Sequence, residues 1–138
     1  MRRGKAFLLR AENMERRIDA ALRKVELFKS LAERVTSGWM QDNVTHSRSI
    51  SANEDAIIRL MEAEEQLKQL CAEYGDVVSE ITAVLAALES REDERLLSDV
   101  FLKHHSLEQI AAREHVTKSC VYKRCDRALG ELERLLDG

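Results

Sequence analysis

The stretch from Ser106 to Leu129 reads SLEQIAAREHVTKSCVYKRCDRAL. Ser106 is a favourable cap for a short helix, because its hydroxyl can accept an unpaired backbone N–H of the first turn. A break is expected at 114–116, where His115 tolerates the positive φ of a tight turn better than most residues do. Thr117 can cap a following helix in the same way as Ser106. The stretch therefore predicts two helices joined by a short turn.

The second of these helices has one apolar face and one polar face. Its apolar residues recur at helical spacing: Val121, Cys125, Ala128, Leu132 and Leu136. The opposite face carries basic and hydrogen-bonding side chains: Lys118, Ser119, Tyr122, Lys123 and Arg127. This pattern is typical of a helix-turn-helix, which lays its second helix in the DNA major groove. We predict that Lys118, Ser119, Tyr122 and Lys123 contact bases and the groove, and that Thr117 and Arg127 hold phosphates.

The C-terminal part, residues 90–137, resembles region four of bacterial sigma factors. Ser-Leu-Glu-Gln-Ile-Ala at 106–111 is similar to the S-x-x-E-I-A opening of that family. Val-Thr-Lys at 116–118 is similar to its entry into the recognition helix, and Arg-Ala-Leu at 127–129, followed by Leu132, is similar to its tail. The resemblance implies a DNA-binding module.

Two positions depart from the family pattern. Arg124 stands where the family usually has an apolar residue, so Cys125 is expected to fill that place in the core. His115 replaces the commoner Gly, Asn or Asp of the turn. With its helical N-terminal half, the chain as a whole resembles small phage-encoded transcription regulators of Gram-positive hosts.

The composition predicts an all-α protein with an uneven charge distribution. The 138 residues include no proline and few aromatic residues, and they are rich in the helix-favouring Ala, Leu, Glu, Arg and Lys. The net charge is only −3, yet residues 1–36 carry ten Lys and Arg against five Asp and Glu, whereas residues 37–89 carry three against ten. A basic helix that precedes an acidic helix favours antiparallel pairing of the two.

Two apolar seams, with spacings that alternate between four and three, predict long coiled-coil helices in the N-terminal part. The first seam comprises Phe7, Ala11, Met14, Ile18, Ala21, Val25, Phe28, Ala32 and Val35. The second comprises Ile57, Leu60, Glu64, Leu67, Cys71, Tyr74, Val78, Ile81, Leu85 and Leu88, with Glu64 as its one charged member. A further column beside the second seam comprises Ala56, Ala63, Leu70, Val77 and Val84. One partner helix cannot cover so wide a stripe, so we expect a homodimer.

The segment 36–53 is predicted to be the loop between the two long helices. It is rich in Ser, Thr, Asn and Gly, which compete with helix formation through local hydrogen bonds. Trp39 in this segment either covers the apolar end of the two helices or binds a partner. Ser51 with Glu54 forms a pattern typical of a capping box at the start of the second long helix.

The predicted fold is therefore a long antiparallel helical hairpin, followed by a C-terminal helix-turn-helix module. Residues 1–89 form the coiled-coil hairpin and mediate oligomerisation. Residues 90–138 form the DNA-binding domain, which begins where Ser90 and Asp93 resemble another capping box.

No group of residues points to catalysis, a metal or a cofactor, so we expect a protein that is not an enzyme. The five glycines stand alone, without a phosphate-binding loop. Adjacent His104 and His105 would point about 100° apart on a helix, and Cys120 with Cys125 matches no zinc spacing. The three cysteines read as free thiols, and no apolar run suits a membrane helix or a signal peptide. A cytoplasmic location is expected.

Three functions fit these features. The first is a sequence-specific transcription regulator of phage or prophage type, which binds double-stranded DNA and has RNA polymerase as a further candidate partner. The second is a phage DNA-packaging protein similar to a small terminase subunit. The third is an assembly protein that binds polymerase or a sigma factor without binding DNA. The basic face of the last helix favours the regulator over the third function.

Overall fold

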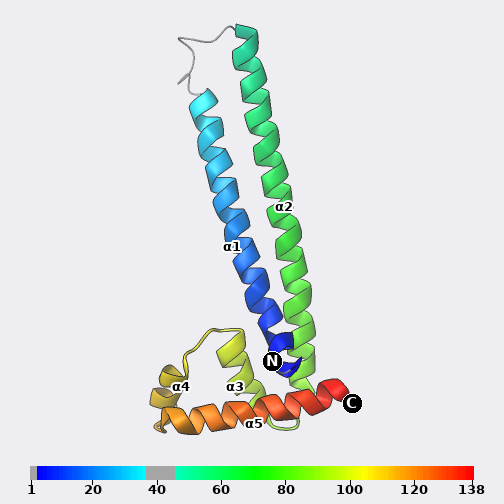
Figure 1. Cartoon of the computed structure of the whole chain (residues 1–138), viewed down its shortest axis with the longest axis vertical. Coiled ribbons are helices and arrows are strands. Elements are labelled where there is room, and N and C mark those ends of the chain that lie inside the picture. Colours follow the sequence, from blue (N-terminus) through cyan, green and yellow to red (C-terminus); the bar gives the residue numbers. More distant parts are fainter. Residues whose placement is uncertain (1–2, 37–45) are drawn as a thin grey trace. The chain divides into compact units, whose positions relative to one another are not determined.

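Five α-helices make up the described part of the chain (Figure 1). The structure is a computed structural model that describes residues 3–36 and 46–138. The helices are α1 (Arg3–Thr36), α2 (His46–Ala86), α3 (Arg91–Phe101), α4 (Leu107–Glu114) and α5 (Lys118–Asp137). No strand occurs in these two ranges, so the predicted all-α class is confirmed.

Helix α2 begins at His46, inside the segment 36–53 that was predicted to be a loop. The predicted loop was therefore too long, and Ser51 lies within the helix rather than at its cap. Ser and Asn cost only about 0.5 kcal/mol each in a helix interior. A helix that is stabilised by the apolar residues behind them can extend through such a segment. Trp39 lies outside the described residues, so both of its predicted roles stay predictions.

The chain forms two compact units, and they do not divide at residue 90. One unit combines Met1–Met14 with Tyr74–Gly138, and the other consists of Glu15–Glu73. The two long helices therefore contribute to both units. The predicted boundary between a hairpin at 1–89 and a module at 90–138 was based on the order of the motifs in the sequence. The two units of the structure instead combine segments that are distant in the sequence.

One apolar core explains why the ends of α1 and α2 belong with the C-terminal helices. Leu8 and Ala11 of α1 are completely buried, and Ile81 and Leu85 of α2 are buried with them. The same core contains buried residues of the last three helices: Leu96, Leu97, Phe101, Ile110, Ala111, Val121, Cys125, Ala128, Leu129 and Leu132. Helices α3 and α4 both pack on α5 (Figure 1). Residues 90–138 thus bury their core only together with the first turns of α1 and the last turns of α2.

The N-terminus of α1 lies directly against α5. The backbone N–H of Arg3 donates to Glu133 Oε1 at 3.0 Å, and the N–H of Gly4 donates to Glu133 Oε2 at 2.6 Å. The carboxylate satisfies two N–H groups that lack partners within the helix, and it faces the positive end of the helix dipole. A Cβ on Gly4 would lie 3.0 Å from Glu133 Oε2 and 3.3 Å from the carbonyl oxygen of Leu129. The missing side chain lets the two helices approach closely.

Within the unit Glu15–Glu73, α2 buries a different apolar seam from the predicted second seam. Ala63 and Leu70 of α2 are buried there, whereas Ile57, Glu64 and Cys71 are exposed. The predicted second seam was therefore wrong at alternate positions in this unit. The seam in the structure has the same spacing of four and three but no charged member, and it comprises residues 56, 60, 63, 67 and 70. Glu64 is exposed to water.

We predict that Leu8→Ala destabilises the core around α5, although Leu8 lies more than a hundred residues away in sequence. The cavity left by a completely buried leucine should cost about 2–5 kcal/mol. Leu22→Ala on the same helix is the matched control, because Leu22 is 41% exposed. Denaturant unfolding gives the stability, and hydrogen exchange of α5 amides locates the change. Unchanged exchange in α5 for Leu8→Ala would contradict the shared core.

Candidate nucleic-acid interface

Helix α4 begins at the predicted cap. The Ser106 hydroxyl accepts a hydrogen bond from the Gln109 backbone N–H at 3.1 Å, and Gln109 Oε1 accepts from the Ser106 backbone N–H at 2.8 Å. This is a complete capping box. It fixes the start of a helix that has only eight residues and gains little from its own length.

The turn between α4 and α5 has the geometry that the sequence suggested. His115 adopts φ 58° and ψ 42°, in the left-handed region. The Val116 N–H donates to the Ala111 carbonyl at 3.0 Å, which closes the end of α4. Thr117 then caps α5, because its hydroxyl accepts a hydrogen bond from the Cys120 N–H at 3.1 Å. Helices α4 and α5 are thus separated by only three residues.

The buried face of α5 packs in the apolar core. Val121, Ala128 and Leu132 are completely buried, and Cys125 is buried beside them. Burial raises the pKa of the Cys125 thiol. Arg124 is half-buried and donates to Glu114 at 2.8 Å. Cys125 therefore fills the place in the core that Arg124 does not, as predicted from the departure at this position.

Four of the six predicted DNA-contacting residues line one groove on the outer face of α5. Thr117, Ser119, Lys123 and Arg127 lie there together, alongside Cys120 and Arg124. Ser119, Lys123 and Arg127 follow one another at intervals of four residues, which keeps them on the side of the helix that faces away from Val121 and Leu132. These side chains are exposed.

The remaining two predicted residues lie outside this groove. Lys118 Nζ forms an ion pair with Glu108 Oε1 of α4 at 2.8 Å. Tyr122 is 62% exposed and borders a separate, largely apolar groove. That groove is lined by Lys5, Val100, Phe101, Leu107, Tyr122, Cys125, Asp126 and Leu129. Lys118 and Tyr122 therefore lie beside α4 and α3, next to the polar groove rather than within it.

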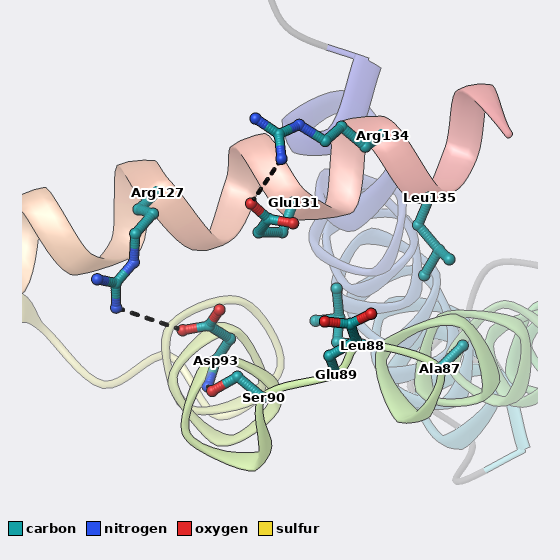
Figure 2. A pocket seen from close by; sticks show the side chains of 9 residues that line it. All are labelled: Ala87, Leu88, Glu89, Ser90, Asp93, Arg127, Glu131, Arg134 and Leu135. Atoms are coloured by element: carbon teal, nitrogen blue, oxygen red, sulfur yellow. Dashed lines mark hydrogen bonds and ion pairs between the residues drawn. The ribbon is translucent and has the colours of Figure 1, made fainter.

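Arg127 also faces a third groove, between α5 and the junction of α2 with α3. Figure 2 shows Arg127 directed toward Asp93, and Arg134 toward Glu131. The Arg127–Asp93 ion pair spans 3.9 Å, and the Arg134–Glu131 pair spans 3.1 Å. Asp93 is buried, and its own N–H donates to the Ser90 hydroxyl that caps α3. Ser90 thus caps α3 through one of the two hydrogen bonds of the predicted capping box. Arg127 lies at the border of two grooves, with its guanidinium drawn toward Asp93.

A buried carboxylate that sequence reasoning missed connects α3 to α4. Asp99 is only 2% exposed, and Arg113 of α4 donates to its Oδ2 at 3.0 Å. Lys103 and Arg95 lie 3.6 and 3.9 Å from the same carboxyl group. The hydrogen bond that Arg113 donates to Asp99 raises the pKa of Arg113. No local pattern signals this pair, because Asp99 and Arg113 lie on different helices.

No protein-family model, curated protein or solved structure matches this chain. The resemblance to sigma region four therefore stays a prediction. Among residues 3–36 and 46–138, no group of three or more His, Cys, Asp or Glu side chains could hold a metal ion. No helix in those ranges is long and apolar enough to cross a membrane.

We predict that the ion pair between Glu114 and Arg124 makes the stability of this unit pH-dependent. The hydrogen bond from Arg124 lowers the pKa of Glu114 below its ordinary value of 4.5. The pair therefore stabilises the fold above about pH 4.5, and this contribution is lost as the pH falls through the lowered pKa. Glu114→Gln should be less stable than the wild type at pH 7, by up to about 1 kcal/mol. The difference should shrink in acid.

Denaturant unfolding at pH 7 and at pH 3, followed by circular dichroism, measures this difference. Glu64→Gln is the control, because it removes one exposed carboxylate from α2 in the other unit. A difference between Glu114→Gln and the wild type that is equal at both pH values would exclude this role of the pair.

Proposed function

We propose that this protein is a sequence-specific DNA-binding transcription regulator. In this proposal α4 and α5 form a helix-turn-helix, and the first turns of α5 enter the DNA major groove. Ser119, Lys123 and Tyr122 reach base edges or the groove, together with Lys118. Thr117 and Arg127 bind phosphates on either side.

The observation that carries the proposal is the outer face of α5. Thr117, Ser119, Lys123 and Arg127 line one groove there, on the side of the helix away from the buried Val121 and the rest of the core. The capped start of α5 leaves its first backbone N–H groups near the same surface, where they favour an anion such as a phosphate. Cationic and hydroxyl side chains along one exposed helix face can contact phosphates and base edges in a DNA groove.

The charge of the C-terminal segment supports selective rather than general DNA binding. Residues 90–138 carry nine Lys and Arg against ten Asp and Glu, so they have no excess of positive charge. Within this segment, residues 117–127 carry four Lys and Arg against one Asp. Binding by long-range attraction to any duplex should therefore be weak, and contacts to particular bases should matter more.

We propose further that the two long helices pair as an antiparallel hairpin and that the protein is a homodimer. In Glu15–Glu73, the side chains of Leu27 and Ile58 are 56% and 52% exposed. Lys24 and Phe28 of α1 form a groove with Ile58 of α2, and Leu27 lies one helical turn from Lys24 on the same face. Large exposed apolar side chains such as Leu27 and Ile58 are more stable against a partner than in water.

The charges around this groove favour a second copy as the partner. Two basic side chains, Lys24 and Arg59, and two acidic ones, Asp55 and Glu62, line it. A twofold interface brings the same patch of both copies together, so the patch must be complementary to itself. Equal numbers of both signs meet this requirement.

The second candidate is a protein that binds another protein rather than DNA, and one observation favours it. The groove beside Tyr122 is largely apolar, with Phe101, Leu107 and Leu129 in its lining. A partner protein such as a polymerase subunit could bind there without DNA. DNA packaging remains the third candidate, and a ring-forming oligomer of eight or more copies would favour it.

We expect purified protein to select a defined site from a pool of random duplexes. Lys118→Ala or Tyr122→Ala should relax the preference, with about 1–3 kcal/mol lost on the best site. Arg127→Ala should weaken binding to all duplexes alike and lower the salt slope by about one unit. Fluorescence anisotropy at several salt concentrations measures both effects. Arg134→Ala is the charge-matched control, because Arg134 pairs with Glu131 near the other end of α5.

If the Lys118, Tyr122 and Arg127 variants all bind the selected site as tightly as the wild type at matched salt, α5 does not read DNA. The interaction protein would then become the leading candidate.

Sedimentation of the full chain at micromolar concentration tests the homodimer. Leu27→Glu and Ile58→Glu should each shift the wild-type dimer toward monomer, because a carboxylate in an apolar interface loses its hydration. Leu22→Glu is the control, because Leu22 is 41% exposed but points away from the face of Leu27 and Leu31. A wild type that sediments only as a monomer would overturn the dimer.

A further inference from the structure

We infer that Glu108 determines specificity at the proposed DNA interface, because its carboxylate positions the ammonium group of Lys118. The inference rests on the proposed DNA-binding function and adds a residue of α4 to it. Glu108 would keep Lys118 directed at one part of the DNA major groove. It would also prevent Lys118 from binding any nearby phosphate.

The geometry of the pair carries the inference. Lys118 is the first residue of α5, and Glu108 lies in the first turn of α4. Lys118 Nζ lies 2.8 Å from Glu108 Oε1, so the ion pair bridges the two helices at their solvent-facing side. The two side chains are 60% and 64% exposed. The pair is therefore at the surface where a duplex would approach, and not in the core.

A lysine in this position needs a partner to have a defined direction. Its ammonium is a compact point charge on a flexible stem, and it can bind phosphates from many positions. The hydrogen bond from Lys118 lowers the pKa of Glu108. Arg124 and Arg127 have acidic partners too, Glu114 and Asp93. Along α5, which the structure describes in full, carboxylates thus restrain most of the cations near the groove.

The consequence differs between random and selected DNA. On random duplexes the contacts are mainly to phosphates, so release of Lys118 would add a phosphate contact and strengthen binding. On the selected site Lys118 must face a base edge, so release would weaken a directed contact. Removal of the carboxylate should therefore raise the affinity for random duplexes and lower the affinity for the selected site. Both changes reduce the ratio of specific to nonspecific affinity. The carboxylate acts as a penalty against wrong sites.

Glu108→Gln in the full chain tests the inference, with a random-sequence duplex and the selected site as probes. We expect affinity for the random duplex to rise roughly three- to tenfold near 0.1 M salt, with a salt slope steeper by about one unit. The specificity ratio should fall by more than that factor. Glu131→Gln is the matched control, because it removes an equal charge from another exposed ion pair, Glu131 with Arg134. Glu131 lies about 20 Å along α5 from Lys118.

The same substitution in a Lys118→Ala background completes the test. There Glu108→Gln should change the specificity ratio no more than Glu131→Gln does, because its effect acts through Lys118. The inference is overturned if the two glutamine variants alter the ratio equally, or if Glu108→Gln still lowers it without Lys118. A wild type that selects a site while Glu108→Gln keeps its full specificity refutes this inference alone. A wild type that selects no site overturns the proposed function as well.

Discussion

Burial of the first turns of α1 against α2 and α5 is the constraint on which the C-terminal unit depends. Leu8 and Ala11 are completely enclosed by residues of the other helices. The Glu133 carboxylate binds the two N–H groups at the start of α1, and Gly4 allows the backbones to approach. The C-terminal half of α5 is therefore committed to packing. Only its N-terminal half and its outer face remain available to a partner.

This division of α5 accounts for the position of the candidate interface. Both halves of the helix are held in one core with α1, α3 and α4, through Val121 and Cys125 in the first half and Leu129 and Leu132 in the second. A helix anchored along its whole length presents its exposed side chains in a fixed order. Rigid presentation of this kind reduces the conformational entropy lost on binding. A short isolated helix could not achieve it.

Local features of the C-terminal helices could be predicted from sequence, because each depends on a few neighbouring residues. The caps at Ser90, Ser106 and Thr117 follow from hydroxyl side chains that precede helical segments. The left-handed turn at His115 follows from the break between two apolar patterns. Each of these signals is complete within four or five residues. The equally local capping signal at Ser51 failed, because α2 begins earlier and continues through it.

Features that depend on contacts between distant segments could not be predicted in this way. The sequence of α2 offers two apolar columns, and the structure buries Ala63 while Glu64 stays exposed. The bond between Gly4 and Glu133 has no signal in either segment alone. At the candidate interface the residue types were visible in the sequence, but not the ion pairs. Lys118 gains Glu108 as its neighbour only because the turn brings α4 back beside α5.

The contact between Gly4 and Glu133 also has a consequence for the order of folding. The two residues are 129 positions apart, so their encounter requires closure of a very long loop. The turn between α4 and α5 closes within a few residues and can form much earlier. During synthesis on the ribosome, Leu8 emerges long before Leu132 exists to cover it. The start of α1 is thus an exposed apolar segment in the growing chain, and its docking is the step that ends this exposure.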